Sequence, residues 1–165
     1  MDNESYVWPT LSVCQVLSSP LAFNGKLIRL TGLVVETDEG AFVSGENDCP
    51  RIVRTGNHVW PTLIAITSPS SSARLHNPAF GYDKDSERVP FAKYRELKKH
   101  FSDKCLVWTF SGMFETREDW ANAQAHYPNG SSKYLGFGNQ NLAPGQLLRH
   151  GVVDVEVSPR CVGQR

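Results

Sequence analysis

Five histidines are the side chains of this sequence best suited to move protons or bind a metal near neutral pH. They are spread along the chain, at His58, His76, His100, His126 and His150. None has a partner at the spacing of a helical metal site, such as His-x-x-x-His or His-Glu-x-x-His. A histidine and a cysteine could still meet in the folded chain, although the sequence does not say which. We predict a surface role for each histidine and no metal site.

The motifs of nucleophilic and phosphate chemistry are also missing. The serines between residues 68 and 72 have no Gly-x-Ser-x-Gly motif around them. Gly136-Phe137-Gly138 lacks the third glycine and the strand-to-helix setting of a dinucleotide site, and the chain has no phosphate loop. The acidic residues between Glu36 and Glu39 are typical of a solvated hairpin turn. The sequence therefore predicts a protein that is not an enzyme and needs no cofactor.

Residues 117–145 carry the most suggestive side chains. Aromatic residues are interspersed there with asparagine and glutamine, and such pairs can stack on sugars or bases and hydrogen-bond to them. We predict a long loop, in which Trp120, Tyr134, Phe137 and Asn139 are the candidate ligand-binding residues. The alternative is that these aromatic residues fix a long loop to the domain.

A second aromatic feature is a repeated pentapeptide. Val7-Trp8-Pro9-Thr10-Leu11 recurs as Val59-Trp60-Pro61-Thr62-Leu63. Two matching exposed Trp-Pro edges could bind a partner. The other interpretation is a chance repeat, or two tryptophans that cap the ends of the domain.

The elements that must position these residues are mostly strands. Apolar alternation and short apolar runs predict strands over Leu27–Glu36, Ala41–Ser44, Leu63–Thr67, Leu106–Phe114 and Gln146–Val157. Val153, Val155 and Val157 are expected on one face of the last strand. Helices are expected over Leu11–Leu17 and Pro90–Phe101. A helix between the third and fourth of five strands is the element order of the OB-fold barrel.

The predicted core follows from the same alternation. Ile28, Leu30, Val34, Trp108 and Phe110 should be buried in one sheet. The helix over 90–101 should close one end of the barrel with Phe91, Tyr94, Leu97 and Phe101, which recur at helical spacing. We expect a mainly β, five-stranded OB-like barrel with a short N-terminal helix. A different β-rich α+β fold is the alternative.

Length and charge set limits on function. The chain has 165 residues, which fits one domain over 1–165 with an extended lead-in at 1–10 and a tail at 158–165. Seventeen basic residues balance seventeen acidic ones, which argues against a nucleic-acid partner. The basic run Lys93–His100 is read as a solvated helix face. No stretch of sequence is apolar enough to span a membrane.

Four cysteines, Cys14, Cys49, Cys105 and Cys161, bear on the cellular compartment. They form no Cys-x-x-Cys pair, so they are either buried thiols or disulfides. The hairpin after the first strand brings Cys49 back toward Cys14, which predicts a disulfide between them. We expect Cys105 and Cys161 to be unbridged. The acidic start of the chain is no signal peptide, so the protein is cytoplasmic unless an export signal was removed, in which case it is periplasmic or secreted.

Three segments together resemble a family of uncharacterised, usually exported bacterial OB-like proteins. They are Val13-Cys14-x-Val16-Leu17 continuing through Phe23-Asn24-Gly25-Lys26 to Gly32, then Cys49-Pro50, and then Gly136-Phe137-Gly138 followed by Gln146-Leu147 and Val153-Asp154-Val155. The resemblance implies a fold and export, but no activity. A histidine often follows the Gly-Phe-Gly turn in that pattern, where this chain has Asn139.

The function expected from the sequence is a non-enzymatic binding or interaction module whose partner is an unknown protein or small ligand. A single-stranded nucleic-acid-binding domain is one alternative, favoured by the fold and the loop aromatics. A hydrolase whose site is assembled from distant residues is the other.

Overall fold

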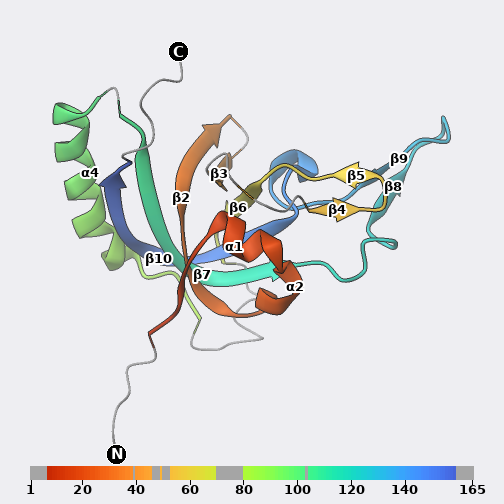
Figure 1. Ribbon diagram of the computed structural model, residues 1–165, viewed down its shortest axis with the longest axis horizontal. Helices are drawn as coiled ribbons and strands as arrows, with labels where there is room; N and C mark the ends of the chain where they lie inside the picture. The colour runs from red at the N-terminus through yellow and green to blue at the C-terminus, as the bar shows by residue number, and fades with distance from the viewer. Residues whose placement is uncertain are drawn as a thin grey trace, which may run out of the picture.

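The computed structural model in Figure 1 describes residues 7–38, 40–45, 49, 53–69, 80–102 and 104–158. The fold is mainly β. The strands are β1 (Thr10–Ser12), β2 (Leu27–Thr37), β3 (Gly40–Ser44), β4 (Arg54–Thr55), β5 (His58–Val59), β6 (Leu63–Thr67), β7 (Leu106–Thr116), β8 (Gln124–His126), β9 (Ser132–Tyr134) and β10 (Gly145–Val157). The helices are α1 (Val13–Ser18), α2 (Pro20–Phe23) and α4 (Arg88–His100), with 3-10 turns η1 (Lys84–Glu87) and η2 (Asn139–Asn141).

Six strands form one large mixed sheet in the order β1-β2-β3-β6-β10-β7. Strand β2 also pairs with β7, so the pairings from β2 through β3, β6, β10 and β7 return to β2. The pairs β1–β2 and β6–β10 are parallel, and the remaining pairs of this sheet are antiparallel. Helix α4 lies between β6 and β7 in the chain.

The core lies on one face of these strands. Ile28 and Leu30 of β2 are fully buried, and Trp108 and Phe110 of β7 are buried with them in the main apolar cluster. Val34 is half-buried against the same cluster. Burial of alternate residues is the pattern that the sequence predicted for β2 and β7, and their direct pairing places both in one sheet as expected.

Strand β10 departs from the simple alternation. Its pairing with β7 is irregular between Arg149 and Gly151 and again between Val152 and Asp154. Each irregularity inserts a residue that has no partner on β7, which reverses the facing of the residues beyond it. The expectation that Val153 shares a face with Val155 is therefore wrong: Val155 is fully buried, whereas Val153 is exposed.

Helix α4 covers one end of the main apolar cluster. Tyr94 and Leu97 pack against that cluster, as predicted. Phe101 follows the last helical residue and is exposed, and Phe91 keeps about a third of its surface exposed, with 36% accessible. The expectation that all four aromatic and apolar residues close the core is therefore wrong for Phe101. Among the described residues, every helix is too short or too polar to cross a lipid bilayer.

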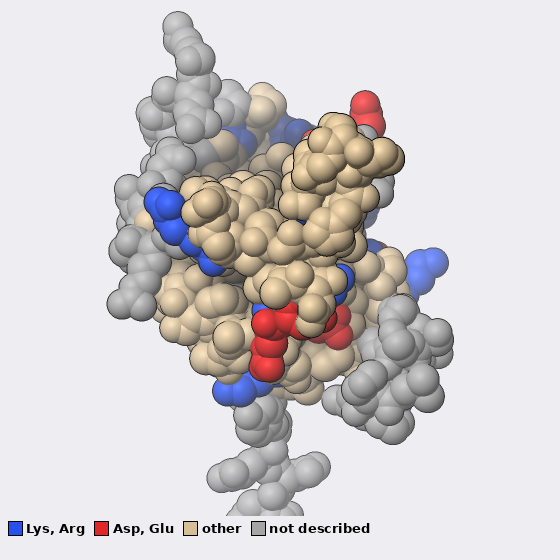
Figure 2. All heavy atoms as spheres, turned by 90° about the vertical axis from the view of Figure 1, so that its right-hand side faces the viewer, with Lys and Arg blue, Asp and Glu red and all other residues tan. Residues whose placement is uncertain are grey.

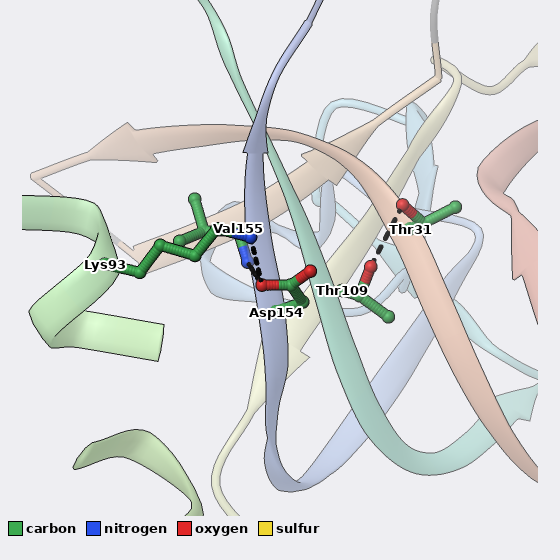
Figure 3. A network of polar contacts seen from close by, with 5 residues as sticks. All are labelled: Thr31, Lys93, Thr109, Asp154 and Val155. Atoms are coloured by element: carbon green, nitrogen blue, oxygen red, sulfur yellow. Dashed lines mark hydrogen bonds and ion pairs between the residues drawn. The ribbon is translucent and has the colours of Figure 1, made fainter. Parts of the chain in front are cut away.

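Polar contacts hold α4 and neighbouring strands in place (Figure 3). Lys93 Nζ of α4 lies 2.8 Å from Asp154 Oδ1 of β10, and the same oxygen accepts a hydrogen bond from the Val155 backbone N–H at 2.8 Å. Thr109 Oγ1 of β7 donates to Thr31 Oγ1 of β2 at 3.3 Å. Lys93, which lies on the face of α4 predicted to be solvated, thus forms an ion pair that links α4 to β10.

The described part of the N-terminal segment ends in a short strand, β1. Thr10–Ser12 pairs in parallel with Arg29–Thr31 of β2, so Leu11 belongs to a strand and not to the predicted helix. Helix α1 starts one residue after Ser12, whose side chain accepts a hydrogen bond from the Gln15 N–H while the Gln15 side chain caps the Ser12 N–H. This capping box explains why the helix begins at Val13.

The pair Cys14 and Cys49 forms a disulfide, with Cα atoms 5.0 Å apart, as the hairpin geometry predicted. Gly45 lies against both sulfurs. A Cβ atom there would come within 2.9 Å of Cys49 Sγ and 3.1 Å of Cys14 Sγ, so a side chain would displace the bridge. Cys105 is also disulfide-bonded, which contradicts the expectation that it is unbridged. Cys161 lies outside the described residues.

Replacing Trp108 with alanine tests the core assignment. Trp108 is 9% exposed and packs on Tyr94 and Phe110. Trp108→Ala should lower the free energy of unfolding by about 3–5 kcal/mol, measured by urea denaturation. Val35→Ala on β2 is the control, because Val35 is 40% exposed and should cost less than about 0.5 kcal/mol. A Trp108 loss below about 1 kcal/mol would place it outside the core.

The Lys93–Asp154 pair predicts a pH-dependent contribution to stability. The hydrogen bond from Lys93 holds the pKa of Asp154 below its ordinary value. Because the folded-state pKa is lowered, the contribution is present above the unfolded value of about 3.9 and is lost as pH falls through the folded value. Both side chains are about two-fifths exposed, at 43% and 40%. Lys93→Gln should therefore cost at most about 1 kcal/mol at pH 7, and the cost should shrink in urea unfolding as the pH falls below the unfolded value. A cost that does not change with pH would contradict the ion-pair explanation.

The disulfide predicts a non-additive stability loss. Cys14→Ser and Cys49→Ser each break the same bond across 35 residues of sequence separation. Each should lower the free energy of unfolding by about 2–4 kcal/mol, because the unfolded chain regains freedom. The double variant should cost no more than either single one. Without reductant, peptides containing these cysteines should resist alkylation in mass spectrometry; free alkylation would contradict the bridge.

Candidate functional site

The segment 117–145 is a long connection between β7 and β10 that includes short ordered elements. It contains the β8–β9 hairpin and the η2 turn. The β4–β5 hairpin lies beside β8–β9: the rings of His58 and Tyr134 are 5.8 Å apart, and a Cβ atom on Gly56 would lie 2.9 Å from Tyr134 Oη. The two hairpins extend together away from the main sheet (Figure 1). We call them the arm, meaning Arg54–Val59 and Gln124–Tyr134.

An aromatic cluster joins the arm to the main sheet. Its centre is Trp60, which is only 2% exposed and donates a hydrogen bond from Nε1 to Thr55 Oγ1 at 2.8 Å. Ring centroids lie 4.8 Å from Trp60 to Trp120, 4.4 Å from Trp60 to His58 and 6.5 Å from Trp60 to Tyr134. Phe137 contacts Trp120 at 6.4 Å. The aromatic cluster comprises His58, Trp60, Trp120, Tyr134 and Phe137.

The predicted site residues are thus brought together in part. Trp120, Tyr134 and Phe137 belong to the aromatic cluster and remain half-buried, so each keeps some surface toward solvent. Asn139 opens the η2 turn, and its side chain lies outside the described part of the structure. The contacts among the rings fit both earlier interpretations, because they anchor the segment and also hold its exposed ring surfaces rigid.

The Gly136-Phe137-Gly138 run packs closely against the main sheet. Phe137 pairs with Ala143 through two backbone hydrogen bonds and packs on a small cluster formed by Phe42 of β3 and Ala65 of β6. Gly136 and Gly138 allow the close approach. A Cβ atom at Gly136 would lie 2.7 Å from Trp60, and one at Gly138 would lie 2.8 Å from Phe42. Residues 136–143 therefore cover the face of β3 and β6 that points away from the main core.

Backbone strain accompanies this covering segment. Gln140 and Asn141 have φ angles of 60° and 56°, in the left-handed region that non-glycine residues rarely adopt. Lys133 of β9 donates a hydrogen bond from Nζ to the Gln140 carbonyl at 3.2 Å. Strained backbone of this kind persists where surrounding contacts fix it, and it is enriched at functional sites.

A cleft of about 630 Å³ opens where the chain leaves β7 for the arm. Its floor and walls come from the turn at Asn24–Gly25, from Met113 and Glu115–Asp119, and from Phe137. Thr116 N donates to Asn24 Oδ1 at 2.9 Å, which fixes the turn after α2 against the end of β7. The aromatic cluster and the cleft share Phe137 and therefore form one continuous candidate site.

The charges of the cleft are mixed. Arg117 lies with its guanidinium carbon 5.3 Å from the Phe137 ring centroid, and its Nε atom is buried without an acceptor among the described residues. Carboxylates of Glu115, Glu118 and Asp119 line the same cleft, and Glu115 accepts a hydrogen bond from Gln146 at 2.8 Å. Seen from the side on which the arm projects, the surface is mostly uncharged, with most of the visible acidic side chains in one patch (Figure 2).

A separate small cavity of about 210 Å³ surrounds His150. His150 is one of the two inserted residues of β10, its Nδ1 contacts the Gly81 carbonyl, and its ring lies 5.4 Å from Trp8. Ser111 lines the same cavity, but within the described structure no hydrogen bond joins it to His150. The two thus lack the direct contact that activates a serine nucleophile. His150 is half-buried.

The repeated pentapeptide does not form two matching exposed edges. Trp60 is buried in the aromatic cluster, whereas Trp8 lies half-buried against His150 in a different part of the molecule. His58 and Trp60 were not predicted as partners of the 117–145 segment. The repeat singled out Trp60, but a contact to residues about sixty positions later leaves no local pattern. In the described part of the chain, no group of three or more histidine, cysteine or acidic residues is arranged to hold a metal.

Comparison of the chain with models of protein families, with curated proteins and with solved structures found no match.

Proposed function

We propose that this chain is a non-enzymatic binding module on an OB-like barrel. The barrel is supported by the five pairings that return from β7 to β2, and by the position of α4 between the third and fourth of these strands. That order is typical of the OB-fold, a five-stranded Greek-key barrel. The Cys14–Cys49 disulfide supports an oxidising compartment, in line with the exported family that the sequence resembles.

The binding surface in this proposal is the exposed side of the aromatic cluster together with the cleft. OB domains commonly bind ligands on the face of strands two and three and with the loop between strands four and five. Here residues 136–143 already cover that face of β3 and β6, so the proposed ligand uses the aromatic cluster, the cleft and the adjoining arm. The observation that carries the proposal is a rigid, partly exposed set of rings around the buried Trp60.

The ligand class in this proposal is a neutral glycan. Exposed residues of the arm are mostly uncharged and rich in amide and hydroxyl groups, among them Asn57, Asn129 and Ser131, with Tyr127 at the tip 48% exposed. Aromatic rings stack on sugar faces, and amides hydrogen-bond to sugar hydroxyls. Nucleic acid is a poorer fit, because the cleft adds three carboxylates next to the rings and phosphate binding needs an excess of cations.

The proposal is tested by titrating the protein with cellohexaose, chitohexaose and maltohexaose while recording backbone NMR spectra. At least one should shift resonances of the aromatic cluster and the arm. Trp120→Ala and Tyr134→Ala should each weaken that binding about tenfold through lost stacking. Phe101→Ala on α4 is the matched control, because this exposed ring lies outside the site and should leave binding unchanged.

A shortened arm separates loss of binding from loss of folding. Gln124 and Tyr134 are register partners, so residues 125–133 can be replaced by an Asn-Gly turn. This variant should keep the free energy of unfolding within about 1 kcal/mol, because connections tolerate changes in length. If the shortened variant failed to fold, the arm would be needed for folding and its proposed role in binding would lose support. Absence of glycan binding, or binding of a fifteen-residue thymidine oligonucleotide that weakens with salt, would overturn the proposal.

A further inference from the structure

A second cavity, of about 350 Å³, lies under helix α4 and is separate from the arm. We propose that this helix pocket binds a small amphipathic anion, meaning a molecule with an apolar or aromatic body and one acidic head group. Its volume falls in the range of small-ligand sites, about 300–1,000 Å³. Figure 1 shows α4 running beside β10 at the end of the sheet opposite the arm.

The inner wall of the helix pocket is aromatic. Trp108 lies 5.2 Å from Tyr94 of α4 and 6.1 Å from Phe110, with which it is nearly parallel at 12°. Ile66 of β6 completes the apolar wall and is only half-buried. Helix α4 therefore closes this end of the core without filling it, which leaves ring faces and an aliphatic side chain available to an apolar ligand body.

The mouth of the helix pocket carries more cations than anions. Lys98 of α4 and Lys104 before β7 line it, and Glu36 is the one carboxylate among its lining residues. Lys98 Nζ lies 5.7 Å from the centroid of the Tyr94 ring, which holds the ammonium group next to the apolar wall. An acidic head group would therefore be attracted at the same place where its apolar body meets the rings.

Arg149 supplies a deeper cation. It lies two residues beyond the fully buried Leu147, before the first irregularity of β10, and so points to the same side as the core. Its guanidinium stacks on Tyr82 at 4.9 Å and lies 3.6 Å from Glu87 Oε1. Its Nε atom is buried and has no acceptor among the described residues. A buried donor of this kind is costly until an acceptor reaches it, and a ligand oxygen would be one.

These features select against neutral and cationic molecules. A neutral molecule would gain only the apolar contacts with the wall, whereas a cation would be repelled by Lys98 and Lys104 at the mouth. The matched probes are 1-anilinonaphthalene-8-sulfonate and N-phenyl-1-naphthylamine, because both carry the same ring system and only the first carries an anionic group. Fluorescence titration should give one sulfonate probe bound per chain, with the neutral probe at least tenfold weaker.

Variants locate the bound probe. Replacing both Lys98 and Lys104 with glutamine should weaken sulfonate binding about tenfold, since each partly solvated cation contributes modestly. Lys99→Gln is the control: it removes the same charge from the same helix, but Lys99 pairs with Glu96 on the exposed surface outside the pocket. It should change the affinity less than twofold. Ala41→Leu, which fills part of the pocket, should weaken both probes while circular dichroism shows an intact fold.

Methyl NMR separates this site from the arm. Bound sulfonate probe should shift the methyl signals of Val34 and Ile66, which line the helix pocket, and leave those of Val59 on the arm unchanged. Trp120→Ala should not alter the affinity, so the outcome is independent of the proposed glycan site. Failure to bind, equal affinity for the two probes, equal effects of the lysine control and the lysine pair, or shifts only at Val59 would each overturn the proposal.

Discussion

The structure depends on strand β2 pairing with different neighbours along its two halves. Leu27–Leu33 pairs with β7, and Leu33–Thr37 pairs with β3. The change falls next to Gly32, where a Cβ atom would lie 2.6 Å from Val43 and 2.7 Å from the Ser44 carbonyl. Only glycine lets β3 approach this closely while the strand coils from one partner to the other. The pairings of β2 with β7 and with β3, and the core that lies between these strands, depend on this close approach at Gly32.

The main strands were predictable because burial leaves a pattern in the sequence. The predicted bounds of β2, β6, β7 and β10 lie within two residues of those observed, since apolar residues alternate or run together there. The β4–β5 and β8–β9 hairpins were missed because strands of two or three residues are too short to show alternation. The irregularities at His150 and Val153 were missed because no characteristic residue type marks the position of an inserted residue in a strand.

The candidate site was predictable to a smaller extent. Aromatic residues spaced among amides pointed to Trp120, Tyr134 and Phe137, which do meet. Trp60, which contacts both Trp120 and Tyr134, comes before β6 in the chain, and only folding brings it to them. The bonded state of Cys105 was missed for a similar reason, because the position of one cysteine relative to another is a property of the three-dimensional structure. The sequence pattern thus identified the cluster residues within 117–145. It did not identify His58 and Trp60, which lie far from them in the sequence.

The short strand β1 has a consequence for the solution behaviour of the domain. Arg29–Thr31 of β2 pairs with β7 on one side and with β1 on the other, and Arg29 N donates to the Pro9 carbonyl at 2.8 Å. Beyond Leu33 the same side of β2 is taken by β3. An unpaired strand edge is a template on which a second chain can add a strand, a common origin of aggregation. Residues 10–12 therefore cover this edge of β2, and proteolytic removal of them would expose an unpaired strand edge that favours self-association.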